Sequence, residues 1–212
     1  MEILNQISQH LQMGDDTKVA ELTKSALDQQ KSPLEILNDG LIAGMNIIGD
    51  QFRVHEIFLP DVLLAAKAMY AGMDLLKPML IEEGIPSRGK IVIGSVQGDL
   101  HDIGKNLVSM MMEGAGFTIT DLGVDIAPEK FVQKAQEIEP DIVAMSALLS
   151  TTMPAMPQTI EALQKAGIRD KVKVMIGGAP VTENYAREIK ADSYASDAGS
   201  AVIKAKKLLS IS

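Results

Sequence analysis

Apolar residues in the first 85 positions recur every three or four residues, the spacing of an α-helix with one buried face. Segments such as KVAELTKSAL and ILNDGLIAGMNIIGDQF follow this spacing, and β-branched runs typical of strands are lacking. Gly14 and Pro60 interrupt the pattern, and Ser32-Pro33 combines a helix N-cap with a proline at the first helical position. Short connections favour an antiparallel bundle. We therefore predict four helices, over residues 2–13, 16–30, 33–52 and 59–82.

The pattern changes after a polar stretch, EEGIPSRGK, which we interpret as a linker over residues 82–90. Short apolar runs typical of strands then follow at 90–96, 117–122, 141–146, 172–176 and 192–195. Helical patterns alternate with them at 104–114, 128–138, 154–166, 181–190 and 197–209. This alternation predicts a Rossmann- or flavodoxin-like α/β domain, a five-stranded parallel sheet with right-handed crossovers and helices on both faces. The chain thus divides into a helical domain, 1–85, and an α/β domain, 89–212.

Composition excludes several classes of protein. The 212 residues contain no cysteine, so disulfides, thiolate zinc sites and cysteine-ligated iron–sulfur clusters are excluded. The net charge of −8 is spread over interspersed residues without a Lys/Arg block, so no nucleic-acid partner is expected. Glu2 stands where a signal peptide would be basic, and no apolar stretch reaches membrane-spanning length. We expect a soluble, cytoplasmic protein without a membrane segment.

Candidate chemistry follows the first predicted strand, in the segment VQGDLHDIGKN. Parallel α/β sheets bind ligands beyond the carboxyl ends of their strands. His101 and Asp99 lie there, Ser146 ends the third predicted strand, and Gly177-Gly178 follow the fourth. An imidazole that binds a metal through Nε2 needs an acceptor for its Nδ1–H, and Asp99 can supply one.

The residues alone leave several chemistries open. Asp99, His101 and Asp102 could together hold Mg²⁺ or iron, or act as the acid and base of a metal hydrolase. The other histidines, His10 and His55, both fall in the helical half. The α/β half therefore has too few histidines for a multi-histidine catalytic metal site. A loop histidine near carboxylates can also be a simple surface hydrogen-bonding residue.

Three motifs together carry a resemblance. Asp99-x-His101-x-x-Gly104 is followed after 41 residues by Ser146-x-Leu148, and after 28 more by Gly177-Gly178. This set resembles the cobalamin-binding signature of methionine synthase and of corrinoid methyl-carrier proteins. In the helical half, GMNIIGDQF and EIFLPDVLLAAKAM resemble the cap module that precedes this domain in methionine synthase. The resemblance covers essentially the whole chain and implies a free-standing carrier subunit of a methyltransferase system, without independent turnover.

The resemblance also implies roles for residues. His101 would be the lower axial ligand of the cobalt, in place of the cobamide's own nucleotide base. Asp99 would orient the imidazole, and Thr152, six residues past Ser146, would continue the hydrogen-bonded relay; these three form the implied catalytic set. Small residues would admit the displaced nucleotide tail, with Ser146 bonded to its base. The implied corrinoid-binding residues are Asp99, His101, Asp102, Ile103, Gly104, Ser146, Leu148, Thr152, Gly177, Gly178, Phe58 and Leu59.

A shield over the upper face of the cobalt is also implied. Phe58 and Leu59, with Val62 or Met69 nearby, are candidates for it, and the competing interpretation is that they form bundle core. Because methylation and demethylation use different partners, the shield would move aside on a hinge over residues 82–89. The Met110-Met111-Met112 run is more typical of core filling than of a ligand set.

The implied cofactor is cobalamin or a related cobamide, cycling between methyl-Co(III) and Co(I). The implied partners are a substrate:corrinoid methyltransferase, a methylcorrinoid:acceptor methyltransferase acting on a folate or thiol, and a reductive activator. Two alternatives keep the cofactor: a cobalamin-dependent sensor or regulator, and the cobalamin subunit of a carbon-skeleton mutase. A DNA-binding regulator would show a basic recognition helix, which the helical half lacks, and mutase subunits resemble that half less.

Overall fold

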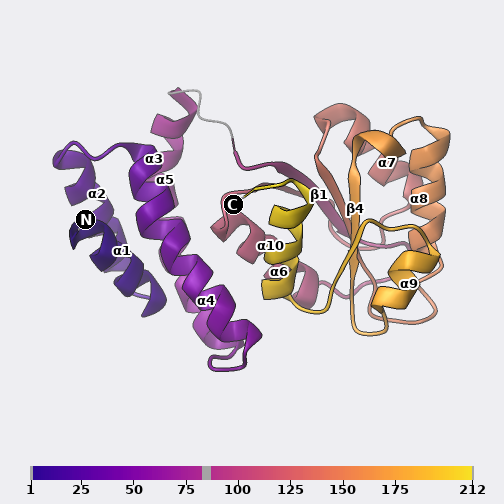
Figure 1. Ribbon diagram of the computed structural model, residues 1–212, viewed down its shortest axis with the longest axis horizontal. Helices are drawn as coiled ribbons and strands as arrows, with labels where there is room; N and C mark the ends of the chain where they lie inside the picture. The colour runs from indigo at the N-terminus through magenta and orange to yellow at the C-terminus, as the bar shows by residue number, and fades with distance from the viewer. Residues whose placement is uncertain (1, 83–86, 212) are drawn as a thin grey trace. The chain divides into compact units, whose positions relative to one another are not determined.

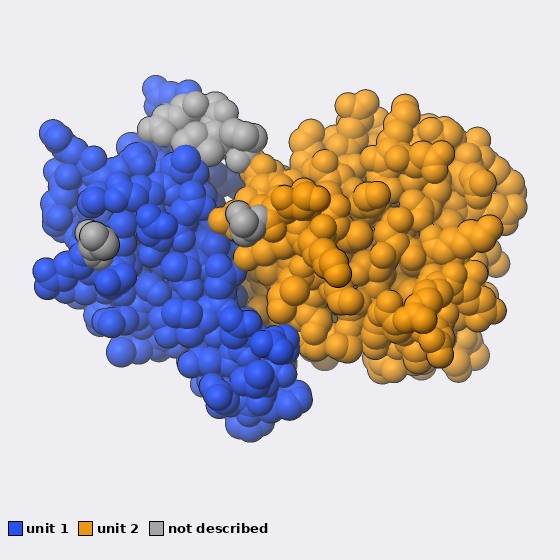
Figure 2. Space-filling model, viewed as in Figure 1, with its two compact units in different colours: residues 1–86, 114–116 blue, residues 87–113, 117–212 orange. Residues whose placement is uncertain are grey.

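A computed structural model of the chain describes residues 2–82 and 87–211 and separates into two compact units (Figures 1 and 2). The first unit comprises residues 1–86 with 114–116, and the second comprises 87–113 with 117–212. Residues 83–86 of the predicted linker lie outside the described residues. Within the described ranges, no helix is long and apolar enough to cross a membrane.

The first unit is helical. Its elements are α1 (Glu2–Gln12), α2 (Asp16–Asp28), α3 (Pro33–Glu35), the π-helical segment η1 (Ile36–Ile42), α4 (Ala43–Arg53) and α5 (Leu59–Glu82). The helix predicted over 33–52 is therefore continuous, but its middle has π-helical rather than α-helical hydrogen bonding. The predicted N-cap is confirmed, because the Ser32 hydroxyl accepts a hydrogen bond from the Glu35 N–H at 3.1 Å.

The second unit is built on a parallel sheet of five strands in the order β2-β1-β3-β4-β5. The strands are β1 (Lys90–Ser95), β2 (Thr118–Asp121), β3 (Ile142–Ser146), β4 (Lys173–Gly177) and β5 (Ser193–Ala195). The predicted fold class is confirmed, and each predicted strand end lies within one residue of the observed end. Because the chain leaves β1 for one edge of the sheet and returns to the other side of β1, the strand order reverses between β1 and β3.

Helices cover both faces of this sheet (Figure 1). They are α6 (Ile103–Gly114), α7 (Pro128–Ile138), α8 (Ala155–Lys165), α9 (Glu183–Glu188) and α10 (Ala198–Leu208), with a short 3₁₀ turn, η2 (Arg169–Lys171). Helices α6 and α10 lie on one face, and α7, α8 and α9 lie on the other. Helix α9 is two residues shorter at each end than predicted, since Thr182 caps its start and Lys190 takes a left-handed φ of 61° just beyond its end.

Alternate strand residues fill the core between the sheet and α7 and α8. Val92, Val143 and Val174 point to this face, where they belong to one buried cluster with Phe131. On α6, Met111 and Met112 are also buried, as expected for core filling, and Met110 is half-buried. The apolar interior holds the strands in register, so the last residues of neighbouring strands meet at one edge. Ser146 there pairs with Ser95 on β1 and with Gly177 on β4.

Candidate functional site

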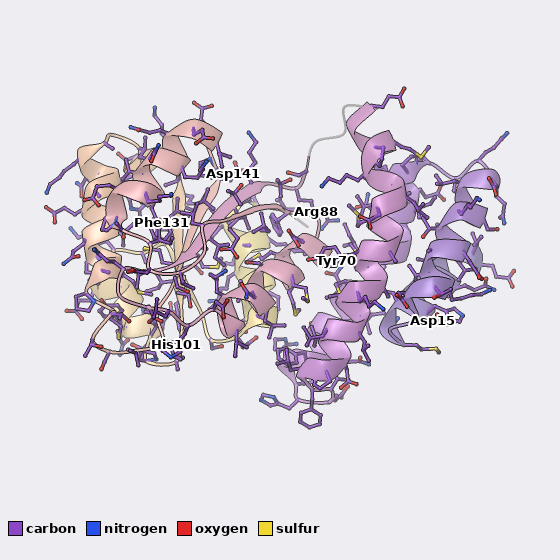
Figure 3. All side chains as sticks on the ribbon, turned by 180° about the vertical axis from the view of Figure 1, so that it is seen from behind. Asp15, Tyr70, Arg88, His101, Phe131 and Asp141 are labelled. Atoms are coloured by element: carbon purple, nitrogen blue, oxygen red, sulfur yellow. The ribbon has the colours of Figure 1, made fainter. Side chains whose placement is uncertain are left out.

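The loop between β1 and α6, residues 96–102, carries His101 at the carboxyl edge of the sheet (Figure 3). It leaves β1 beside the point where the strand order reverses. Gly98 turns the loop with a φ of 82°, a conformation that glycine adopts without steric cost. The Ser95 hydroxyl, fully buried at the end of β1, donates a 2.6 Å hydrogen bond to the His101 carbonyl. The main chain at His101 is therefore tied to the sheet.

Asp99 is fully buried beneath His101 and uses both carboxylate oxygens. Its Oδ1 accepts the His101 backbone N–H at 3.0 Å and lies 2.8 Å from the imidazole Nδ1. Its Oδ2 accepts hydrogen bonds from the Leu148 N–H and from the Thr152 hydroxyl, both at 2.7 Å. The structure thus brings together the three residues of the predicted relay, although they come from two loops far apart in the sequence.

The protonation of Asp99 follows from two opposing effects. Burial by itself raises the pKa of a carboxyl group, but hydrogen bonds from Thr152, Leu148 and His101 stabilise the anion and lower the pKa of Asp99 well below its ordinary value. An ionised carboxylate can only accept, so in a neutral imidazole the proton is on Nδ1 and the lone pair on Nε2. Because the His101 side chain is 50% exposed, this ring can present Nε2 to a ligand.

Asp102, Ile103 and Gly104 begin α6 rather than joining the Asp99–His101 pair. The Asp102 carboxylate accepts a 3.1 Å hydrogen bond from the side-chain amide of Asn106, one helical turn on. Ile103 is 74% exposed. A Cβ built on Gly104 meets no atom within 4 Å, so open space lies above the first turn of the helix.

Gly177 and Gly178, at the end of β4, differ in how much room the fold leaves for a side chain. Gly178 has a φ of 127°, and a Cβ placed on it would lie 1.8 Å from the carbonyl oxygen of Ala147. The fold itself therefore requires glycine at 178, whether or not a ligand approaches. At Gly177 a Cβ would lie 3.1 Å from the Ala195 carbonyl oxygen, a tight contact but a milder one. Ser146, in register with Gly177, is half-buried at the end of β3.

Exposed apolar side chains occur on the loops that carry His101 and that contact Asp99. Leu100 and Ile103 flank His101 in sequence and are more than 70% exposed, and Leu148 and Leu149, beside the Asp99 carboxylate, are each more than 40% exposed. Leucine and isoleucine gathered around a polar centre mark a binding surface more often than a solvent-facing one. This surface suits a broad, largely apolar ligand with one point of coordination.

The alternative metal-hydrolase site does not fit this geometry. Asp99 has no exposed oxygen, and its hydrogen-bond donors already occupy both of them. Within residues 2–82 and 87–211, no group of three His, Cys, Asp or Glu side chains is placed to hold a metal ion. A metal bound here would have His101 as a single protein ligand, which favours a metal that arrives with its own equatorial ligands.

The predicted shield residues lie in the helical unit. Phe58 is 69% exposed just before α5, where its carbonyl accepts the Asp61 N–H at 3.0 Å and its own N–H donates to the Asp61 carboxylate at 2.9 Å. Leu59, the first residue of α5, is half-buried. Val62 and Met69 are buried, as core residues are. Of the four, Phe58 has the exposure that a shielding side chain needs.

Sequence reasoning missed two residues of the site. Ser95 is a polar residue in an apolar strand, a signal that the sequence offered. Asp125, in the loop after β2, accepts the Gly98 N–H at 2.7 Å and gives its own N–H to the Asp99 carbonyl at 2.9 Å. Nothing in its sequence neighbourhood marks it, because its partners lie 26 and 27 residues earlier in the chain.

Comparisons with known proteins identify the family of this chain. Models of the B12 binding domain match residues 89–203 and residues 3–77. A corrinoid protein of Desulfitobacterium hafniense (strain Y51) is 42% identical over 212 residues, covering 99% of this chain and 98% of the relative. Dimethylamine corrinoid protein 1 of Methanosarcina acetivorans is 48% identical over 190 residues, covering 89% of this chain and 87% of the relative.

A solved structure agrees as well. A chain of the methanol:cobalamin methyltransferase complex MtaBC from Methanosarcina barkeri superposes with a TM-score of 0.87 at 28% identity, covering 99% of this chain and 80% of that chain. One family model spans more than half of the sequence, and relatives above 40% identity span nearly all of it. The resemblance drawn from the motifs is therefore confirmed: this chain belongs to the B12-binding family, among the corrinoid proteins.

Proposed function

We propose that this protein binds a corrinoid through His101 and carries a methyl group on its cobalt from a donor-specific methyltransferase to a second methyltransferase. The observation that carries the proposal is the pairing of a fully buried, ionised Asp99 with a half-exposed imidazole held 2.8 Å away. The relatives of this chain include dimethylamine and trimethylamine corrinoid proteins and a chain of a methanol:cobalamin methyltransferase complex.

The residues present fit a corrinoid. His101 offers one nitrogen ligand, and the exposed leucines and isoleucine beside it offer apolar contact to a macrocycle. When bound, the corrinoid supplies a cobalt that takes up and gives off the methyl group, cycling between methyl-Co(III) and Co(I). The open space at Gly104 and the half-buried Ser146 beside Gly177 are where we assign the nucleotide tail.

The chain orients the His101 imidazole and determines which of its ring nitrogens carries the proton. Asp99 fixes the Nδ1–H tautomer and so keeps the Nε2 lone pair directed outward. Leu148 and Thr152 fix Asp99 in turn, because their donors hold the oxygen that the imidazole does not use. A carboxylate held in this way also makes the imidazole a better donor to a metal, since it stabilises the partial positive charge that coordination creates.

We propose three partners for this chain. MtaBC is a methanol:cobalamin methyltransferase complex, and we propose a comparable donor-specific methyltransferase as the first partner here. A methylcorrinoid:acceptor methyltransferase acting on a folate or thiol would take the methyl group. A separate reductive activator would restore Co(I) after accidental oxidation, because a chain without cysteine cannot bind a cysteine-ligated iron–sulfur cluster.

The direct test is a titration of the cofactor-free chain with methylcobalamin, followed by absorption spectroscopy. The wild type should bind and show the spectrum of a cobalt coordinated by imidazole instead of the cofactor's own base. His101→Ala should keep the fold, because the ring is half exposed, and lose that spectrum. Identical spectra for the two proteins would contradict the proposal.

Carrier function needs its own experiment. The reduced, corrinoid-loaded chain is incubated with candidate methyltransferases and a panel of donors: methanol, methylamines, betaines and aryl methyl ethers. One combination should methylate the cofactor, and a folate or thiol methyltransferase should then remove the methyl group. Methylation that proceeds equally with free cobalamin would show that the chain is no carrier.

The assignment of the nucleotide tail can be tested at Gly104. Gly104→Leu should leave the fold intact, because a Cβ at this position meets no atom within 4 Å, but its side chain should weaken methylcobalamin binding by occupying the open space. Gly104→Ala is the matched control and should bind nearly as well as the wild type. Equal binding by all three proteins would remove Gly104 from the site.

Phe58 and Leu59 remain our candidates for shielding the upper face of the cobalt. Phe58→Ala should speed photolysis of the methylated cofactor, and Leu63→Ala, at another exposed apolar position of the same unit, is the control. If photolysis rates of the two variants equal that of the wild type, Phe58 does not shield the cobalt.

A further inference from the structure

Asp125 makes its own hydrogen bonds to the loop of His101, separate from the bond that Thr152 makes to Asp99. Its carboxylate Oδ1 accepts the Gly98 N–H at 2.7 Å, and its backbone N–H donates to the Asp99 carbonyl at 2.9 Å. Two hydrogen bonds from one residue thus fix the peptide unit before Gly98 and the peptide unit after Asp99. Neither bond is part of the Asp99–His101–Thr152 relay.

Asp125 is itself fixed to the sheet. Its neighbour Ile126 donates its N–H to the Ser95 carbonyl, and Gly123 accepts the Ser95 N–H, both at 3.0 Å. The loop after β2 is therefore tied to the end of β1 on either side of Asp125. Because Asp125 is fixed to the sheet, its hydrogen bonds hold the loop of His101 in a fixed position relative to the sheet.

The backbone of Asp125 is strained. Its φ of 54° lies in the left-handed region, which is sterically unfavourable for a residue with a Cβ and which aspartate and asparagine tolerate better than most residues. Strain of this kind persists where surrounding contacts impose it. Here those contacts are the hydrogen bonds to Gly98 and Asp99.

We propose that Asp125 is a positioning residue, which sets the backbone of Asp99 so that its carboxylate meets the His101 imidazole at hydrogen-bond distance. The inference rests on the proposed function, since it gives His101 its role as the corrinoid ligand. Asp99 is then held at both ends: Thr152 and Leu148 fix the carboxylate, and Asp125 fixes the main chain. Asp125 acts as an acceptor rather than as a charge, so a neutral acceptor of the same shape should replace it.

Three variants separate these possibilities. Asp125→Asn keeps an oxygen acceptor and tolerates the left-handed backbone but removes the charge. Asp125→Gly removes the acceptor while relieving the backbone strain, so it should fold. Glu139→Gly is the control, because Glu139 has a similar φ of 52° at the end of α7, and its N–H bonds within that helix to the Ala135 carbonyl.

The first readout needs no corrinoid. Nuclear magnetic resonance of the cofactor-free chain should show the ring nitrogen signals of His101 shifted in Asp125→Gly and unchanged in Asp125→Asn and Glu139→Gly. In the wild type, the Gly98 amide proton should exchange slowly with solvent. Fast exchange of that amide would overturn the inference without recourse to any variant.

The second readout is the dissociation constant for methylcobalamin. Asp125→Gly loses the hydrogen bond from the Gly98 N–H, which helps to orient His101, so methylcobalamin binding should weaken about fivefold to tenfold. The other two variants should change the dissociation constant by less than about twofold. Wild-type affinity in Asp125→Gly would overturn the inference, as would an equal loss in Asp125→Asn, which would assign the effect to charge. If the wild type itself fails to bind methylcobalamin, the proposed function fails, and the first readout still decides the role of Asp125.

Discussion

The side-chain hydrogen bonds at helix starts in the helical unit join close neighbours, whereas the site in the α/β unit also depends on bonds between distant residues. In the helical unit, the bonds at the helix starts link Asp15 to Lys18 and Ser32 to Glu35, each three residues apart. In the site, Thr152 reaches Asp99 across 53 residues. Helix geometry alone fixes the first kind, and only the packing of the sheet can fix the second.

The two units also differ in charge. Residues 1–86 contain 13 acidic and 6 basic residues, and residues 87–212 contain 15 and 14, so almost the whole net charge of −8 belongs to the first part. The proposed coordination of cobalt by His101, by contrast, depends on the buried carboxylate of Asp99, which lies in the nearly neutral second part. Long-range attraction of a basic partner would therefore act on the helical unit, while the site depends on local hydrogen bonds that net charge does not reveal.

The strongest way to break the α/β unit is at Gly178. Gly178→Ala places a Cβ 1.8 Å from a backbone oxygen at a φ of 127°, so we expect a loss of at least about 3 kcal/mol in the free energy of unfolding. Urea denaturation measures it. Gly104→Ala is the control, and a loss at Gly178 no larger than at Gly104 would contradict this account.

Two buried threonines compare a long-range bond with a local one. Thr152→Val removes a donor to the buried carboxylate and should cost about 2 kcal/mol, as hydrogen bonds to charged groups do. Thr159→Val removes a bond from the hydroxyl to the Ala155 carbonyl one turn earlier in α8 and should cost about 1 kcal/mol or less. Equal losses of unfolding free energy in the two variants would show that the bond from Thr152 to Asp99 stabilises the fold no more than a local bond does.

Acid should weaken the site through Asp99. Because the pKa of Asp99 is lowered in the folded state, the group contributes stability at pH above its ordinary value of 3.8 and loses it as the pH falls toward the lowered pKa. The difference in free energy of unfolding between the wild type and Asp99→Asn should therefore shrink as the pH falls from about 6 to about 3. A difference that stays constant over that range would contradict the lowered pKa.

The smallest effect is expected at a local cap of the helical unit. Ser32→Ala removes the bond to the Glu35 N–H and should cost about 1 kcal/mol of stability. Because this bond joins neighbours in the same helix, the absorption spectrum of the corrinoid-loaded protein should not change. A spectral change in Ser32→Ala would show that the helical unit influences the coordination of the cobalt.

The sequence was sufficient for the elements and for the central motif. Helical spacing, strand runs and breakers predicted every strand end to within one residue, because these signals act between near neighbours. The resemblance of the motifs to a known family implied roles for Asp99, His101 and Thr152, which the structure brings together. The pattern could not show the π-helical turn of η1, since its apolar positions also satisfy ordinary helical spacing.

What only the tertiary structure decided is how the loops support the motif and which glycines the fold itself requires. The contact of Asp125 with the loop of His101 depends on bringing the ends of β1 and β2 side by side. Gly178 is required because β3 and β4 pair in register and bring its backbone against Ala147. Helices, strands and caps depend on residues close together in the sequence, so the sequence pattern predicts them. Distances between loops are set only when the sheet assembles, so the spacing of residues along the chain does not predict those distances.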